Sequence, residues 1–217
     1  MKSIGVYWLV VSIAILVVFL AFGLKICRRP LGILIDARNK MSLSRLQIVL
    51  WSWLIISAFF SVALARKTVD IDMDPQIWAL MGISLASTTG AAIIKGTKAG
   101  QEPDDAKLTA RAKEAVSTGQ GVLHQNSNMK DAKLVDMVEG EEISNYSYVD
   151  ITKVQMLFFT VAMVVGYAWM LWGSNWTFPQ GSQPIKFPSL SGPMVTILGI
   201  SHAGYLVNKA APKTPTK

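Results

Sequence analysis

The stretch ITKVQMLFFT, residues 151–160, follows a polar, charge-rich segment and opens an apolar run. The same order of residue classes occurs 108 positions earlier, in LSRLQIVLWS at residues 43–52. In both copies a hydroxyl residue, a cation and an identical glutamine precede four apolar positions. The repeat predicts two similar helical units within one chain.

The composition indicates a membrane protein. Hydrophobic residues make up 51% and charged residues 16% of the 217 positions, and the mean hydropathy is +0.37. A soluble domain carries about 25% charged residues. No charged residue lies well inside the apolar blocks, where each would cost at least about 2.5–3.5 kcal/mol. We therefore expect an all-α integral membrane protein with five transmembrane helices of close to 20 residues, at residues 4–24, 46–65, 77–94, 154–173 and 192–208.

The first block has an alternative interpretation as a secretory signal peptide. Its apolar core is longer than the usual 7–15 residues, and the basic cluster KICRR at 25–29 follows it rather than precedes it. We therefore interpret residues 1–29 as an anchor helix. The single cysteine, Cys27, excludes an internal disulfide framework.

Basic residues are distributed unevenly over the ends of these blocks. Such residues collect on the cytoplasmic side of a membrane, which predicts an external N-terminus and a cytoplasmic C-terminus. The formal charge of +7 then indicates anionic lipid headgroups as partners, and we do not expect nucleic acid binding. The cations on the predicted cytoplasmic side are Lys25, Arg28, Arg29, Arg38, Lys40, Arg45, Lys95, Lys98, Lys209, Lys213 and Lys217.

A second repeat, Gly-Ile-Ser at 82–84 and 199–201, lies in the third and fifth blocks. Each unit is thus an entry helix followed by a return helix, and both units start from the same face. This predicts a parallel repeat. The expected organisation is an anchor (1–29), a first hairpin (30–95), a cytoplasmic insert (96–150), a second hairpin (151–209) and a disordered tail (210–217).

The return helices carry small and polar residues on one face. Small residues four positions apart let helix backbones approach closely in lipid, so helix packing is the favoured interpretation and a pore lining is the alternative. The entry motifs place cations where they reach headgroups. The packing or pore candidates are Gly82, Ser84, Ala86, Gly90, Gly199, Ser201, His202 and Ala203, and the entry motif comprises Arg45, Gln47, Lys153 and Gln155.

Both hairpins resemble a family of uncharacterised bacterial membrane proteins. The similar segments are SLSRLQIVLWSWLII, LMGISLASTTGAA, YVDITKVQMLFFTVAMV and FPSLSGPMVTILGISHAGYLVNKAAP. The resemblance implies the bacterial inner membrane and the duplication, and it implies no activity. The first unit departs from the family pattern, because Thr88 and Thr89 stand where the second has Tyr205 and Leu206.

Two features were tested for chemistry. Asp70, Asp72 and Asp74 have the spacing that opens a calcium loop, but Pro75 replaces its glycine, which excludes an EF-hand. A solvated acidic turn is expected, with cation concentration at a pore mouth as the alternative. His202 has no carboxylate within a span, so a neutral, hydrogen-bonded histidine is favoured over a proton relay. We expect no enzyme, no cofactor and no metal site.

Two classes of function remain. One is a homo-oligomeric channel-like or transport assembly, lined by the small polar residues of the return helices. The other is a non-conducting scaffold that presents residues 96–150 to a cytoplasmic protein partner. The uncharged polar lining favours the first.

Overall fold

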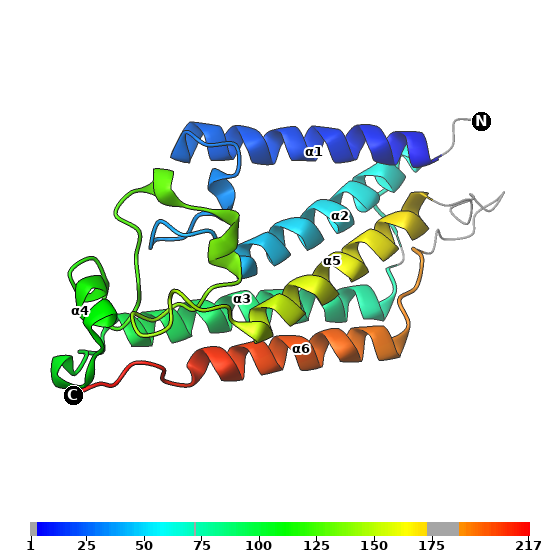
Figure 1. Ribbon diagram of the computed structural model, residues 1–217. Coiled ribbons are helices and arrows are strands. Elements are labelled where there is room, and N and C mark those ends of the chain that lie inside the picture. Colours follow the sequence, from blue (N-terminus) through cyan, green and yellow to red (C-terminus); the bar gives the residue numbers. More distant parts are fainter. Residues whose placement is uncertain (1–3, 72, 173–186) are drawn as a thin grey trace.

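The computed structural model describes residues 4–71, 73–172 and 187–217, and these residues are helical with no strand beyond isolated bridges. A helix occupies each of the five apolar blocks (Figure 1). A shorter helix and four single 3-10 turns fall outside them. The helices are α1 (Ile4–Cys27), α2 (Leu43–Arg66), α3 (Pro75–Ala99), α4 (Ala110–Val116), α5 (Ile151–Trp172) and α6 (Gly192–Ala210).

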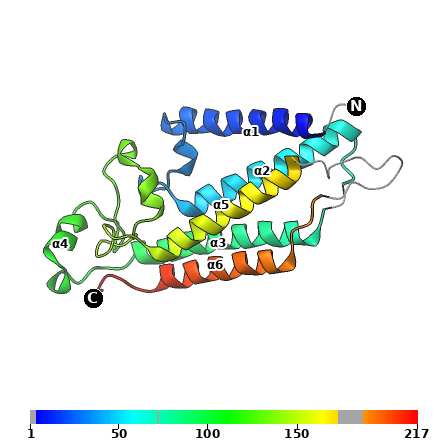
Figure 2. The same cartoon turned by 45° about the vertical axis from the view of Figure 1, so that its right-hand side comes forward.

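Helices α2, α3, α5 and α6 form a bundle, and α1 lies along α2 on its outside (Figures 1 and 2). Within the bundle α2 contacts α3 and α5, and α6 contacts α3 and α5. Both hairpins run away from the end that carries α4 and return to it (Figure 1). We call this end, where residues 100–150 gather, the capped end.

Four of the helices are long and apolar enough to cross a membrane, namely α1, α2, α3 and α5. The predicted fifth span is a helix, but α6 has only 19 residues and carries His202, Asn208 and Lys209. Its outer face is nevertheless apolar, with Ile200 67% and Val207 72% exposed. Within the described residues, four helices are therefore shown to be candidate spans.

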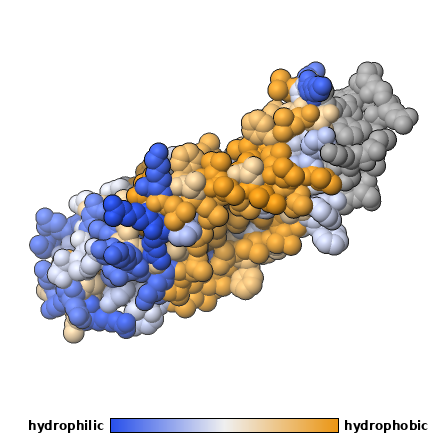
Figure 3. Space-filling model, turned by 90° about the horizontal axis from the view of Figure 1, so that it is seen from above, coloured by the Kyte–Doolittle hydropathy of each residue, from blue (hydrophilic) through white to orange (hydrophobic). Residues whose placement is uncertain are grey.

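The polarity of the bundle is reversed relative to a soluble protein. Large apolar side chains cover its outside, with Phe158 72% and Trp169 75% exposed, and a hydrophobic belt is separated from a hydrophilic end in Figure 3. Exposed apolar area on this scale marks contact with lipid or with other protein. The interior, in contrast, holds several serines together with Gln47 and His202. This arrangement fits a bundle whose solvent is the bilayer.

Insert 96–150 folds as a cap on the helix ends. It has a small core of its own, formed by Leu108, Ala112, Ala115 and Ile143. Its helix α4 begins after Thr109, whose hydroxyl accepts from the amide of Ala112. The cap therefore holds a fixed place over the bundle.

The tail predicted to be disordered is bound to this cap, which corrects that expectation. The Glu142 carboxylate accepts from the amides of Lys213, at 2.9 Å, and Thr214, at 2.6 Å. The backbone also pairs at Asp104 N with Pro215 O, at 2.9 Å. Composition suggested disorder because the tail has few apolar residues, whereas a buried carboxylate from a distant segment holds it.

Gly121 fixes how the cap meets α3, and it yields a prediction. Its φ is +60°, and a Cβ would lie 2.5 Å from the Ala99 carbonyl oxygen. The left-handed conformation alone costs a non-glycine residue about 1–2 kcal/mol. Gly121→Ala should therefore lower the melting temperature by roughly 4 °C or more.

The matched control for this change is Gly100→Ala. Gly100 has a φ of −91°, and its Cβ would lie 3.6 Å from the nearest atom. The control should melt like the wild type. Equal melting of the two variants in detergent would contradict the close approach of the cap to α3.

Candidate functional site

A carboxylate at the capped end, Glu141, joins three parts of the chain. Its oxygens lie 3.0 Å from Lys153 Nζ on α5 and 3.6 Å from Arg38 Nη2 in the turn before α2. They also contact Lys209 Nζ on α6. The side chains of Lys153 and Lys209 are only 4% and 3% exposed. One anion from the cap thus pairs with cations from three segments.

Two further carboxylates extend these ion pairs. Asp36 lies 2.9 Å from Arg38 and 2.7 Å from Lys95 on α3, and Glu142 lies 2.6 Å from Lys98. Buried charges need such pairing, because an uncompensated one costs several kcal/mol. We call this set the charged cluster, and its members are Asp36, Arg38, Lys40, Lys95, Lys98, Asp136, Glu139, Glu141, Glu142, Lys153 and Lys209.

Two carboxylates of the charged cluster, Asp36 and Glu141, have lowered pKa values. Burial would raise the pKa of Asp36, but Arg38 and Lys95 hold it well below its usual range. Burial likewise opposes ionisation of Glu141, and the cations of Lys153, Lys209, Arg38 and Lys95 outweigh it, so that this pKa is also low. Burial and then the charge of Lys40 lower the pKa of His124 to about 4. At neutral pH the carboxylates are charged and His124 is neutral.

A second group of polar residues lies deeper in the bundle. Gln47 Nε2 donates to Thr160 Oγ1 at 2.7 Å and lies 3.3 Å from His202 Nε2. None of these three side chains is more than 3% exposed. One turn nearer the cap, Ser44 Oγ lies 3.1 Å from Tyr205 OH. Helices α2, α5 and α6 therefore share a buried hydrogen-bonded group.

Several buried polar atoms around this group make no hydrogen bond within the described residues. Burying such an atom unpaired costs about 1–3 kcal/mol. Native proteins leave few atoms in this state, and each one calls for a physical explanation. We call these residues, with Thr160, the polar core. The unpaired atoms are Gln47 Oε1, His202 Nδ1, Ser84 Oγ, Ser87 Oγ and Ser201 Oγ.

The entry motifs predicted to be equivalent occupy different environments. Gln47 is fully buried while Gln155 is exposed, and Arg45 is exposed while Lys153 is buried. The buried faces of α2 and α5 correspond at an offset of 109 rather than 108, which is a rotation of about 100°. The matching buried pairs are Ser44 with Lys153, Gln47 with Met156, Trp51 with Thr160, and Ala58 with Tyr167.

The two copies of the Gly-Ile-Ser motif are more alike in burial than the two entry motifs. Ser84 and Ser201 are both buried, at 2% and 7% exposure. Gly82, Ala86 and Ala203 lie on exposed faces, and a Cβ on Gly82 would meet nothing within 4 Å. Gly90 and Gly199 do face a neighbouring helix, with Cβ distances of 3.2 Å to Leu206 and 3.6 Å to Ile83. Within one chain, Gly90 and Gly199 are therefore packing positions and Gly82 is not.

The acidic turn has a local role at Asp74. Its side chain accepts from the Gln76 amide at 2.8 Å and caps α3, with Pro75 at the first helical position. Asp70 is exposed, and Asp72 lies outside the described residues. No group of three metal-ligating side chains occurs among the residues that were described.

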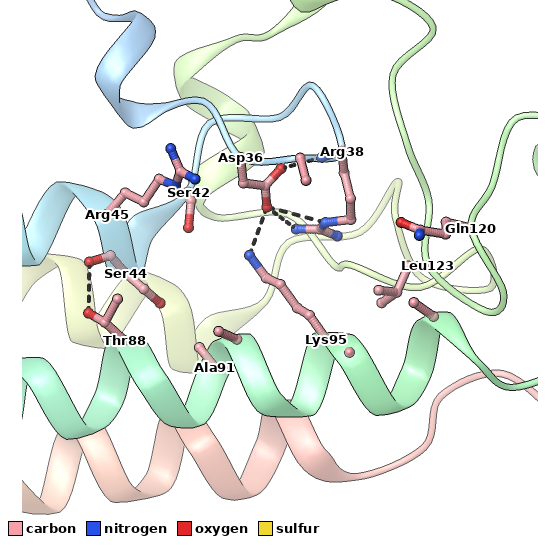
Figure 4. Close-up of a pocket in the computed structure, with 14 residues that line it drawn as sticks. Asp36, Arg38, Ser42, Ser44, Arg45, Thr88, Ala91, Lys95, Gln120 and Leu123 are labelled. Atoms are coloured by element: carbon pink, nitrogen blue, oxygen red, sulfur yellow. Dashed lines mark hydrogen bonds and ion pairs between the residues drawn. The ribbon is translucent and has the colours of Figure 1, made fainter. Parts of the chain in front are cut away.

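A pocket of about 320 Å³ opens beside the charged cluster, between the turn at 36–45, the end of α3 and the cap (Figure 4). Asp36, Arg38, Arg45 and Lys95 supply charge to its walls. Hydroxyls and apolar groups supply the rest, from Ser42, Ser44, Thr88, Ala37, Ala91, Ala92 and Leu123. We call this the cap pocket.

Sequence reasoning did not find the charged cluster. The signal present was an excess of cations at helix ends and of carboxylates in the insert, but the pairs join residues up to 103 positions apart. Comparison with protein-family models, with curated proteins and with solved structures found no match to this chain.

The low pKa values of the charged cluster predict loss of stability in acid. The ordinary pKa values are 3.8 for Asp36 and 4.5 for Glu141. Above these pH values, both carboxylates are charged in the folded and in the unfolded chain. Below them the unfolded chain binds more protons, so the free energy of unfolding falls. The pKa of His124 is lowered from its ordinary 6.5 to about 4, so this residue also lowers the free energy of unfolding as the pH falls from 6.5 to about 4. The melting temperature should therefore fall as the pH is lowered below 6.5, and it should fall more steeply below pH 4.5.

Glu141→Gln should lower the free energy of unfolding at pH 7 by about 3 kcal/mol or more, because it leaves buried cations uncompensated. Its acid dependence should be flatter than that of the wild type. Glu114→Gln, on an exposed residue of α4, is the matched control and should change neither. Identical pH profiles for both variants would show that Glu141 does not hold the cap.

Proposed function

We propose that the chain is a membrane transport protein, in which a small polar solute or a weakly solvated ion moves along the polar core between α2, α3, α5 and α6. One observation supports this most directly: five of the eight buried side-chain atoms that lack hydrogen-bond partners among the described residues belong to the polar core. At about 1–3 kcal/mol each, their combined cost is large for packing alone. A water or solute passing through would supply the missing hydrogen bonds.

The length of the polar face supports the same proposal. Buried polar groups recur along α2 at Ser44, Gln47, Trp51 and Ser61, whereas buried Ser57 accepts from Trp8 Nε1 of α1. The distance from Ser44 to Ser61 is about 25 Å of helix, close to the roughly 30 Å of a bilayer core. Polar groups that span most of a membrane from inside a bundle are typical of a path.

The chemistry of this face favours uncharged solutes. Along α2 no charged residue follows Arg45 before Arg66, and along α3 none precedes Lys95. A path without fixed charge discriminates weakly and does not by itself bind protons. The charged cluster lies across the capped end, where its ion pairs close the path, so movement of the cap is the proposed gate.

Orientation and assembly belong to the same proposal. The cations at the capped end favour a cytoplasmic cap in a bacterial inner membrane. The exposed small-residue face at Gly82 and Ala86 favours association of copies, since it allows close helix approach in lipid.

The orientation gives a direct prediction. Reporter fusions after Asp105 should be active as cytoplasmic proteins, and fusions after Pro75 should be active only as external ones. An external signal after Asp105 would reverse the proposed threading.

The path gives a second prediction. Thr160→Val removes the hydroxyl that pairs with Gln47 while keeping side-chain volume, so flux of glycerol or urea into proteoliposomes should change roughly three- to tenfold. Thr196→Val is the matched control, because Thr196 lies on the exposed face of α6 and bonds only its own helix, at Gly192 O.

Flux equal to that of empty liposomes for the wild type and both variants would contradict transport. It would favour the alternative, a scaffold that presents residues 96–150 to a cytoplasmic partner. The fixed cap, bound through Glu141 and Glu142, meets the structural requirement of that alternative.

A further inference from the structure

The cap pocket has an excess of positive charge. Three cations, Arg38, Arg45 and Lys95, line it against one carboxylate, Asp36. Asp36 accepts from both Arg38 and Lys95 and so holds these two cations side by side (Figure 4). An anion that enters the pocket meets a net charge of about +2 in walls that are partly desolvated, where electrostatic attraction is stronger than in water.

The cations retain free donors for such an anion. Lys95 Nζ has three N–H groups and one hydrogen-bond partner within the described residues, Asp36. Arg45 uses only Nη1, which donates to the carbonyls of Ile33 and Ile35. Its Nη2 and Nε donors have no partner among the described residues. Guanidinium and ammonium groups in the wall of one pocket match the oxygens of a phosphate.

The remaining lining is divided between polar and apolar groups. Ser42 and Thr88 contribute hydroxyls to the lining, with that of Thr88 donated to Ser84 O at 2.9 Å, and Ala91, Ala92 and Leu123 offer apolar contacts. Inorganic ions gain nothing from apolar contacts, whereas the carbon skeleton of a phosphate ester can pack against these apolar side chains. A volume of about 320 Å³ falls at the lower end of the range for small-molecule sites.

The pocket also lies at the depth of lipid headgroups. Arg45 is in the first turn of α2, and Lys95 is the first charged residue that follows the apolar length of α3. The surface changes from hydrophobic to hydrophilic toward one end of the molecule (Figure 3). Basic pockets between helices on the cytoplasmic side are sites where anionic headgroups bind.

We propose that the cap pocket binds a phosphate-bearing anion through Arg45 and Lys95, and that the phosphate belongs to the headgroup of an anionic phospholipid. Lys95 shifts part of its interaction from Asp36 to the phosphate, and Arg45 contributes its free guanidinium edge. The glycerol portion contacts Ala91 and Ala92. This binding does not depend on transport through the polar core.

The test uses the full chain purified in detergent, with binding followed by native mass spectrometry and by the rise in melting temperature. Phosphatidylglycerol should bind and raise the melting temperature, and zwitterionic phosphatidylcholine should do so at least about tenfold more weakly. Arg45→Gln and Lys95→Gln should each weaken phosphatidylglycerol binding by about tenfold or more, the worth of a hydrogen bond to a charged group.

Two further variants separate a specific site from general charge and from misfolding. Lys25→Gln removes one charge from an exposed residue at the end of α1, outside the pocket, and should leave binding unchanged. Ala92→Trp changes no charge and fills the pocket from its exposed rim. It should abolish specific binding while the melting temperature without lipid stays that of the wild type.

Inorganic phosphate and glycerol phosphate form the second arm. If they compete with phosphatidylglycerol, and Arg45→Gln weakens them equally, the phosphate site stands and its natural source is a free phosphate. If only the lipid binds, the headgroup is the source. Phosphatidylglycerol binding that is the same in the wild type, Arg45→Gln, Lys95→Gln and Ala92→Trp would overturn the proposal.

Discussion

Glu141 is the point on which the capped end depends. Helices α2, α3, α5 and α6 begin or end there, and the chain near these ends brings cations together in a small volume. Lys153, Lys209 and Arg38 would repel one another without an anion between them, and all three are buried. Because a carboxylate in low dielectric interacts strongly with each of them, one side chain from the cap fixes the relative positions of α5, α6 and the turn before α2. The position of the cap follows from this contact.

The rest of the bundle is not held by ion pairs, since its surroundings are hydrocarbon. Apolar side chains gain little there by leaving the outer surface, so Phe158 and Trp169 can lie exposed, and the helices associate through packing and polar contacts instead. The contact of Gln47 with Thr160 and His202 joins three helices in this way. A bundle that needed only adhesion would pair such groups completely. The hydroxyls of Ser84 and Ser201 have no hydrogen-bond partner among the described residues, and the proposed path depends on this feature.

Helix positions were readable from the sequence because apolar length depends on composition alone, and all five helices form where they were expected. The orientation of each helix about its axis was not readable in the same way. Gln47 and Gln155 match in motif, yet only Gln47 is buried, because one residue of register turns a side chain by about 100°. The charged cluster was also out of reach, since Glu141 meets Lys209 across 68 residues and no local pattern specifies that pair. Membership in the resembled bacterial family stays a prediction.

Ser44 connects the cap pocket, the charged cluster and the polar core. It lines the cap pocket, and its hydroxyl lies 3.1 Å from that of Tyr205, whose ring is 5.3 Å from Lys209 Nζ. Lys209 in turn binds Glu141, and Gln47 of the polar core is one turn beyond Ser44 on α2. An anion that drew Lys95 away from Asp36 would therefore change the electrostatic field on the residues that hold the cap. A ligand shifts a gate only through such a difference in binding between two states, and the pocket lies where that difference would act on both the cap and the path.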